Sequence, residues 1–215
     1  MPKPVKIITG KAAPLSSDDV DTDQIIPAQF LKVTEKAGLS RYLFYRWRYD
    51  EAGALTGAFV LDRPEFRGSK ILVVGRNFGI GSSRENAVWA LLDIGVECVI
   101  ASSFGDIFYN NAAKNGLLCV RLPEESLVRL RELARPANLT VTVDLQAQTL
   151  SFGGTEVHFE VERYVKDRLM IGMDDIGITT TQYEEAIRRY EANAPPYTLP
   201  RKYEPYAESG KARTR

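Results

Sequence analysis

The stretch Ile71-Leu-Val-Val-Gly-Arg-Asn-Phe-Gly-Ile-Gly-Ser-Ser-Arg-Glu-Asn-Ala-Val-Trp-Ala-Leu-Leu-Asp-Ile-Gly95 determines the fold of this chain. Its apolar beginning, Ile71–Gly75, predicts a buried strand, its glycines and serines a turn, and Arg84–Ile94 a helix. Backbone amides, the hydroxyls of Ser82 and Ser83 and the Arg84 guanidinium would then meet at one helix N-terminus. The positive end of a helix dipole favours an anion, so this stretch predicts an anion site where a serine can take part in proton chemistry.

Two simpler interpretations of this turn stay open. Ser82 or Ser83 can act as an ordinary N-cap, and Glu85 can pair with Arg84 as an internal anion in place of a bound carboxylate. The glycine spacing fits neither a Walker A loop, because no Gly-Lys-Ser/Thr follows, nor a dinucleotide fingerprint. A serine hydrolase is also disfavoured, since the only histidine, His158, lies far along the chain in an alternating strand pattern.

The chain after Pro64 alternates between strand and helix patterns, which is typical of an α/β fold with a parallel or mixed sheet. Alternating apolar and polar residues over Leu139–Val161, interrupted by Gly153-Gly154, predict a β-hairpin or meander. Further strands are predicted at Lys6–Gly10, Cys98–Ala101 and Leu117–Leu122, and further helices at Phe104–Asn115, from Pro123 to Leu133, at Val165–Ile171 and at Thr181–Ala192.

The overall composition excludes several classes of function. The 28 Lys and Arg residues balance the 28 Asp and Glu residues of the 215-residue chain, so its charge calls for neither nucleic acid nor an acidic membrane as partner. No apolar run is long enough to cross a bilayer, and the N-terminus lacks the apolar core of a secretory signal, which favours a cytoplasmic protein. The stretch Arg41–Tyr49 predicts a packed element with solvated arginines rather than a surface for single-stranded nucleic acid.

Cysteine, histidine and aspartate residues form no recognised metal-binding pattern. Cys98 and Cys119 lie in apolar runs, which predicts buried strand residues, and two thiols are too few for an iron–sulfur cluster. His158 has no companions that would complete a zinc site. Four aspartates fall at positions 18, 19, 21 and 23, but the spacing lacks the central glycine and terminal glutamate of an EF-hand. A surface loop leading into a short helix is predicted instead.

Four motifs, in the same order, resemble the swivelling domain of the aconitase superfamily. They are Asp19-Val-Asp-Thr-Asp-Gln-Ile-Ile-Pro27, Phe78-Gly-Ile-Gly-Ser-Ser-Arg-Glu-Asn-Ala87, Ile100-Ala-Ser-Ser-Phe-Gly-Asp-Ile-Phe-Tyr-Asn-Asn111 and Asp174-Asp-Ile-Gly-Ile-Thr179. With the chain length, they resemble the bacterial family of 3-isopropylmalate dehydratase small subunits over residues 5–193. The resemblance implies a swivelling β/β/α domain, a mixed sheet flanked by helices, over residues 1–194, and leaves residues 195–215 as an extended tail.

The resemblance also implies a hydro-lyase that works only with a separate large subunit. In that family the large subunit holds a [4Fe–4S] cluster through three cysteines, and the iron acts as a Lewis acid on the leaving hydroxyl. No metal is expected on this chain. The implied substrate is a small dicarboxylate, 2-isopropylmalate, which would lose water and regain it the other way round as 3-isopropylmalate, a step of leucine biosynthesis.

Site residues are implied by the motifs that carry the resemblance. Ser82 would be the alkoxide that removes the substrate proton, and Arg84 would bind a substrate carboxylate and stabilise that alkoxide. Ser83 and Gly81 would contact the same carboxylate. Asp23 would orient a catalytic histidine of the large subunit.

Three positions bear on which substrate is used. Leu31, in the segment Gln29–Thr34 that resembles the family's side-chain-preference loop, would suit an isopropyl group, and simple helix packing is the equal alternative. Family members often carry cysteine where this chain has Ile80, and histidine where it has Asn86. These departures leave citramalate, dimethylmalate or another substituted malate as alternative substrates. A non-catalytic module that binds a dicarboxylate without any partner is the alternative from another functional class.

Overall fold

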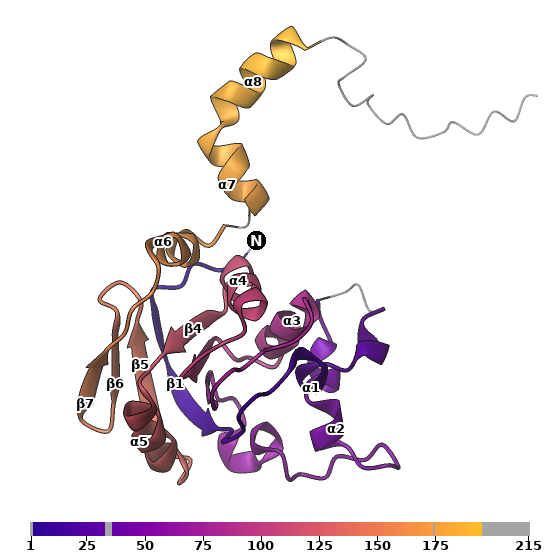
Figure 1. The fold of residues 1–215 in the computed structure, drawn as a ribbon, viewed down its shortest axis with the longest axis vertical. Helices are drawn as coiled ribbons and strands as arrows, with labels where there is room; N and C mark the ends of the chain where they lie inside the picture. Colours follow the sequence, from indigo (N-terminus) through magenta and orange to yellow (C-terminus); the bar gives the residue numbers. More distant parts are fainter. Residues whose placement is uncertain (1, 33–35, 174, 195–215) are drawn as a thin grey trace, which may run out of the picture. The chain divides into compact units, whose positions relative to one another are not determined.

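A computed structural model of the chain describes residues 2–32, 36–173 and 175–194 (Figure 1). The chain divides into two compact units, with the boundary between Asp175 and Ile176. The second unit carries α7 (Asp175–Gln182) from its second residue onward and α8 (Glu184–Asn193). The tail predicted for residues 195–215 lies outside the described residues, and the domain boundary predicted after residue 194 stays a prediction.

The described part of the first unit is built on one mixed seven-stranded sheet in the order β4-β3-β2-β1-β5-β6-β7. Strands β1 to β4 pair in parallel, whereas β1, β5, β6 and β7 pair antiparallel. The strands are β1 (Ile7–Pro14), β2 (Ile71–Val73), β3 (Cys98–Ala101), β4 (Leu118–Arg121), β5 (Thr140–Asp144), β6 (Thr149–Phe152) and β7 (Thr155–His158). The predicted mixed α/β sheet and the predicted meander are confirmed.

Helices cover the parallel half of this sheet. They are α3 (Glu85–Asp93), α4 (Asp106–Asn115) and α5 (Glu124–Ala134), whereas α6 (Arg163–Ile171) packs against α4. α3 and α4 connect β2 to β3 and β3 to β4, and because such crossovers are right-handed, two steps in one direction place both helices on one face. α3 and α4 pack against each other, while α5 packs on β1 and β2 (Figure 1). As predicted, α4 ends at Asn115, and its C-cap is Gly116, whose φ of 85° suits a glycine.

The buried positions explain why these segments form strands and helices. Every residue of β2 and of β3 is buried, as expected for parallel strands covered on both faces. β5 instead alternates, with Val141 and Val143 buried and Thr140 and Thr142 more exposed. On α3 the buried positions Ala87, Val88, Ala90 and Leu91 form one helical stripe, which faces the core.

The connection between β1 and β2 holds short helices that position the site. They are α1 (Thr22–Ile25), α2 (Tyr45–Arg48) and 3₁₀ turns at Ala28–Phe30, Leu39–Tyr42, Val60–Asp62 and Pro64–Phe66. Arg41 and Arg46 are exposed, as predicted for the aromatic-basic stretch. For Arg48 the prediction of a solvated side chain was wrong. Arg48 is buried because Asp62 takes two of its hydrogen bonds, from Nε at 2.8 Å and from NH2 at 2.7 Å.

Two predicted elements differ most in their bounds from the observed ones. β1 continues to Pro14 instead of ending at Gly10, because Ala12 and Ala13 are buried between β2 and β5. The helix predicted over Thr181–Ala192 is observed as α8, but it begins only at Glu184, and Thr181 and Gln182 belong to α7. Tyr183 leaves helical geometry, with φ −115° and ψ 16°, so that one helix ends at Gln182 and the next begins at Glu184.

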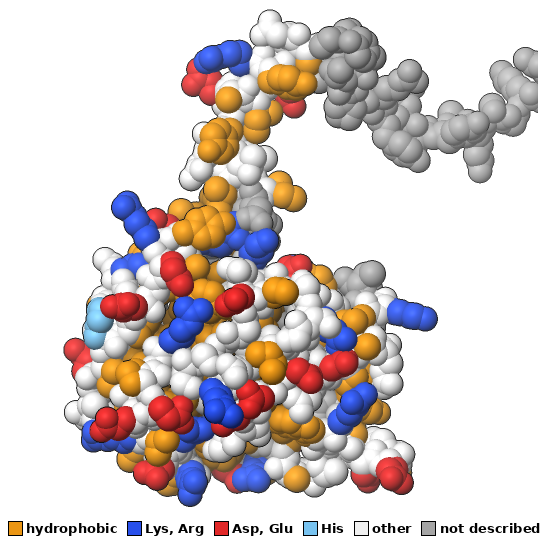
Figure 2. All heavy atoms as spheres, in the orientation of Figure 1, with side chains coloured by type: hydrophobic (Ala, Val, Ile, Leu, Met, Phe, Trp, Pro, Cys, Tyr) orange, Lys and Arg blue, Asp and Glu red, His pale blue; other side chains and the backbone are white. Residues whose placement is uncertain are grey.

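The second unit exposes apolar side chains along both of its helices, while charges of both signs are interspersed over the first unit (Figure 2). Ile176, Tyr183 and Tyr190 are between 57% and 74% exposed. On the polar side of α8, Arg188 donates to Glu184 at 2.7 Å, four residues earlier. Such pairs support a short helix only modestly.

Both cysteines are free and fully buried, Cys98 in β3 and Cys119 in β4, as predicted. Burial raises the pKa of both thiols well above the ordinary value of 9.0. Because the thiolate is the reactive form, we expect neither cysteine of the native protein to be alkylated at mildly alkaline pH. Both should react once the chain is unfolded in denaturant. Mass spectrometry of the alkylated protein checks this, and rapid native labelling would contradict the buried positions.

Candidate active site

The aspartate-rich segment ahead of α1 runs alongside the loop that follows β2. The Gly79 N–H donates to the Val20 carbonyl at 2.7 Å, and the Thr22 N–H donates to the Ile80 carbonyl at 2.9 Å. The buried Thr22 hydroxyl adds a bond of 3.0 Å to the Ser82 carbonyl. These bonds bring the first motif of the sequence against the glycine–serine motif more than 50 residues later.

The clustered aspartates each have a separate structural task, so they do not form a calcium loop. Asp18 accepts the Arg76 N–H at 2.9 Å, and Asp19 accepts the Asn77 side-chain amide at 2.7 Å. The latter bond is the main reason that the pKa of Asp19 lies below its ordinary value of 3.8. Asp21 caps α1 through a reciprocal capping box. The predicted surface loop leading into a short helix is confirmed.

Asp23 and Arg84 meet as an ion pair where the two segments converge. NH1 of Arg84 donates to Oδ1 of Asp23 and, at 3.3 Å, to the Ile26 carbonyl. Asp23 also accepts the Ala28 N–H at 2.9 Å. The Arg84 side chain is only 13% exposed. The bond from Arg84 is the largest cause of a pKa of Asp23 below 3.8.

The structure supports neither of the two simpler interpretations of the turn before α3. Arg84 itself occupies the N-cap position, with extended backbone, so neither Ser82 nor Ser83 caps the helix and Arg84 lies just outside the first turn. Glu85 is not the internal partner of Arg84, because its carboxylate accepts a hydrogen bond from Asn115 at 2.7 Å. The guanidinium is held by an anion from another element, which sequence spacing alone did not predict.

Gly81, Ser82 and Ser83 form an exposed ridge directly before Arg84. The φ of Gly81 is 96°, a conformation that favours glycine. Within the described part of the chain, the Ser82 and Ser83 hydroxyls have no hydrogen-bond partner, and no side chain caps α3. Two unpaired hydroxyls, an uncapped helix start and a guanidinium are therefore adjacent at the surface, an arrangement suited to a carboxylate.

The remaining predicted residues lie apart from this ridge or are not tied to it. Leu31 ends the Ala28–Phe30 turn and packs, partly buried, against the hydrophobic core. His158 is exposed at the end of β7. Within the described residues, no three His, Cys, Asp or Glu side chains come together as ligands for a metal ion.

Comparisons with known proteins establish the family. Residues 2–125 match the aconitase C-terminal domain. The 3-isopropylmalate dehydratase small subunit of Rubrobacter xylanophilus is 48% identical over 200 residues, which cover 93% of this chain and 98% of that protein. That of Dinoroseobacter shibae is 51% identical over 190 residues, covering 87% and 94%. The chain belongs to the family of 3-isopropylmalate dehydratase small subunits.

A solved structure of this dehydratase family agrees with that assignment. The crystal structure of 3-isopropylmalate dehydratase from Methanocaldococcus jannaschii is 26% identical, with a TM-score of 0.64, and the match covers 85% of this chain and 99% of that chain. The predicted swivelling α/β fold of the aconitase superfamily is thereby confirmed, as is membership of a hydro-lyase family. None of the described helices combines the length and the apolar character needed to cross a bilayer.

Sequence reasoning missed two features that build this candidate site. The Thr22 hydroxyl holds the Ser82 carbonyl, and Asp23 holds the Arg84 guanidinium. The sequence did mark both residues, because Thr22 and Asp23 lie in the first of the four motifs. Only the side-by-side course of the two segments reveals which atoms they hold.

Proposed function

We propose that this chain, paired with a cluster-bearing large subunit, interconverts 2-isopropylmalate and 3-isopropylmalate in leucine biosynthesis. The proposal rests chiefly on the exposed, unpaired Ser82 and Ser83 hydroxyls beside the Arg84 guanidinium. Its substrate class follows from the family, whose members are named for this reaction. Each dicarboxylate isomer loses one proton from carbon and one hydroxide from the neighbouring carbon, and regains them in exchanged positions.

Ser82 is the proposed base. As an alkoxide it takes the proton from the substrate carbon and becomes a neutral hydroxyl, and in the hydration step it returns a proton to carbon. A serine hydroxyl is a weak acid, so the alkoxide needs nearby positive charge. The Arg84 guanidinium and the uncapped start of α3 supply it two residues away.

Arg84 is the proposed carboxylate anchor. Its NH1 is engaged by Asp23 and by the Ile26 carbonyl, whereas Nε and NH2 have no partner within the described residues. These two N–H groups form a parallel fork that matches the two oxygens of a carboxylate. Ser83 and the Gly81 backbone are placed beside it to contact the same group.

The [4Fe–4S] cluster of the proposed enzyme does not fit this chain. The two thiols are fully buried in adjacent strands, and the described residues offer no set of three metal ligands. We therefore assign the cluster to the large subunit, where it supplies Lewis acidity toward the leaving hydroxyl. The steps assigned to this chain are binding of a carboxylate and movement of a proton.

Substrate preference is proposed to depend on the segment that begins beside the ion pair. The Ala28 N–H binds Asp23, and Leu31 follows three residues later, so this segment leaves the ion pair in the direction of an apolar side chain that would suit an isopropyl group. Because Ile80 and Asn86 depart from the family pattern, citramalate and dimethylmalate are the competing substrates to assay.

Asp23→Asn is expected to raise KM about tenfold while kcat stays within about threefold, because asparagine lacks the charge that holds Arg84. The pKa of Asp23 is lowered, so the pair persists at neutral pH and is lost only as the pH falls through that lowered value. Steady-state kinetics of the assembled enzyme measure this. Asp19→Asn, in the same segment but paired with Asn77, is the matched control and should leave KM unchanged.

The alternative role of Asp23, orienting a large-subunit histidine, gives a different signature. In that case Asp23→Asn lowers kcat and shifts the pH–rate profile, while KM stays at its original value. A raised KM therefore indicates that Asp23 positions Arg84, whereas a lowered kcat with a shifted pH–rate profile indicates that it positions the large-subunit histidine.

Reconstitution tests the proposed function as a whole. The isolated chain should show no turnover, and mixing it with the matching large subunit under anaerobic conditions should produce the absorbance of an α,β-unsaturated diacid from 2-isopropylmalate. Tight binding of a dicarboxylate to the isolated chain, with no turnover in the mixture, would instead support the non-catalytic module.

A further inference from the structure

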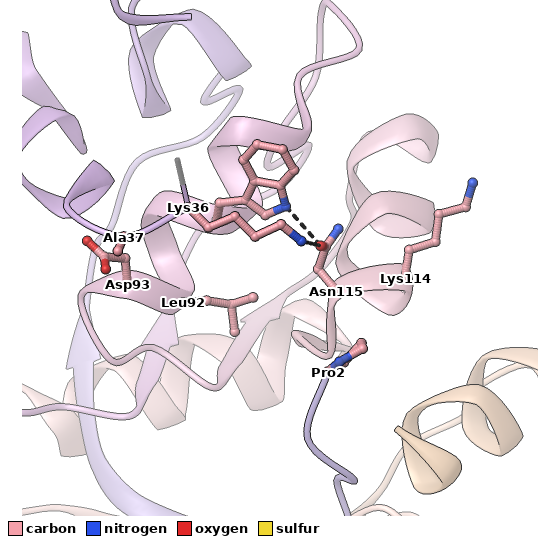
Figure 3. Close-up of a pocket in the computed structure, with 8 residues that line it drawn as sticks. Pro2, Lys36, Ala37, Leu92, Asp93, Lys114 and Asn115 are labelled. Atoms are coloured by element: carbon pink, nitrogen blue, oxygen red, sulfur yellow. Dashed lines mark hydrogen bonds between the residues drawn. The ribbon is translucent and has the colours of Figure 1, made fainter. Parts of the chain in front are cut away.

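Asn115, the last residue of α4, joins α3, α4 and the segment ahead of the Leu39–Tyr42 turn (Figure 3). Its Nδ2 donates to Oε1 of Glu85 at 2.7 Å, and its Oδ1 accepts from Nε1 of Trp89 at 2.8 Å. Glu85 and Trp89 are four residues apart and so share one face of α3. Lys36 donates to the same oxygen at 3.3 Å, with its Nζ 4.7 Å from the centre of the Trp89 ring.

The amide of Asn115 has no hydrogen-bonding capacity left. Its second Nδ2 proton goes to the Asn111 carbonyl at 2.9 Å. An asparagine amide has two donor protons and two acceptor positions, and all four are used. The donor side therefore faces Glu85, and the acceptor side faces Trp89 and Lys36 along the wall of a pocket of about 420 Å³.

The Asn115 amide binds the carboxylate of Glu85, the residue that follows Arg84 in the chain. Glu85 is the first residue of α3, where the helix dipole attracts an anion and an adjacent guanidinium is a natural partner. Arg84 nevertheless pairs with Asp23, and Glu85 is directed to Asn115. If Asn115 released it, Glu85 would be the nearest anion in sequence to the fork of Nε and NH2. It would then compete with a substrate carboxylate for that fork.

We propose that Asn115 is a positioning residue for the hydro-lyase reaction, holding the Glu85 carboxylate away from Arg84 so that the guanidinium stays open to substrate. The inference rests on the proposed role of Arg84 as the carboxylate anchor. It extends the active site to α4, a helix that contributes no group to the reacting atoms.

Asn115→Asp is the sharpest test, because aspartate keeps the shape and the acceptors for Trp89 and Lys36 but repels Glu85. In the assembled enzyme we expect KM to rise about tenfold, with kcat within about twofold of the original. Adding Glu85→Gln should restore KM to within about threefold, since the glutamine carries no competing charge and can donate to the introduced aspartate. Glu85→Gln alone should leave KM unchanged.

Trp89→Phe is the matched control, since it removes the indole bond to the same amide and leaves the donors to Glu85 in place. It should leave KM unchanged, and an equal rise in KM would assign the effect to packing and overturn the proposal. An unchanged KM in Asn115→Asp, or a raised KM that Glu85→Gln does not restore, would also overturn it. Thermal unfolding of each variant accompanies the kinetics. If Arg84→Lys left KM unchanged, the proposed anchor itself would be wrong, whatever Asn115 does.

Discussion

Replacing Ser82 by alanine is expected to lower kcat of the assembled enzyme about 10³-fold, the usual contribution of a positioned proton-transfer group. KM should stay within about threefold, because Arg84 and the neighbouring amides still bind the carboxylate. Ser82 is exposed, and within the described residues only its backbone carbonyl is engaged, by the Thr22 hydroxyl. Removing Oγ therefore breaks no described contact, and the loop should keep its conformation.

Ser83→Ala is the matched control for this loss. Ser83 is equally exposed, is next in the chain and also has an unpaired hydroxyl within the described residues. Its proposed contact is to the substrate carboxylate, so its loss should mainly raise KM, by about tenfold. If the two variants lost kcat equally, or if Ser83→Ala lost more, the assignment of the base to Ser82 would be wrong.

Arg84→Lys should lower kcat/KM about 10²-fold, although the charge is kept. A lysine ammonium can replace the NH1 bond to Asp23, but it then has no second pair of parallel donors for a carboxylate. The substitution should therefore weaken both proposed roles of Arg84, which are binding of the substrate carboxylate through the fork and stabilisation of the nearby Ser82 alkoxide. Steady-state kinetics with 2-isopropylmalate measure the loss.

Arg63→Lys is the control for the arginine substitution. The Arg63 side chain is exposed, and within the described residues it hydrogen-bonds only the Ala58 carbonyl, at 3.0 Å from NH2 and 3.2 Å from Nε. Its kinetics should match the original enzyme. Normal kcat/KM in Arg84→Lys would show that a single positive charge is sufficient, and the fork would play no part in binding.

The sequence predicted secondary structure well where the local residue pattern agrees with the burial of those residues in the fold. The apolar runs of β2 and β3, the helices between the strands and the end of α4 before Gly116 each follow from patterns a few residues long. The break between α7 and α8 does not, because Tyr183 is an ordinary residue in a helical pattern whose backbone leaves the helix. Helix propensity is a weak prior at such a position.

The candidate site was only partly predictable for a different reason. The ridge of Gly81, Ser82 and Ser83 and the adjoining Arg84 lie within one stretch, so their residue types could be interpreted together. The Asp23–Arg84 pair spans 61 residues, and the Glu85–Asn115 bond spans 30. Either carboxylate would have been a reasonable partner for Arg84 by charge alone. The choice between them depends on the loop ahead of α1 running beside the loop after β2, and on α4 packing against α3.

Deuterium incorporation shows whether Ser82 carries the proton of the reaction. When the assembled enzyme hydrates the unsaturated diacid in D₂O, the Ser82 hydroxyl, being exposed, exchanges with solvent and should deliver deuterium to the substrate carbon. Mass spectrometry follows the label in the product. We expect rapid incorporation by the original enzyme and incorporation about 10³-fold slower by Ser82→Ala. Equally rapid incorporation by an assembled Ser82→Ala enzyme would contradict the assignment of Ser82 as the base.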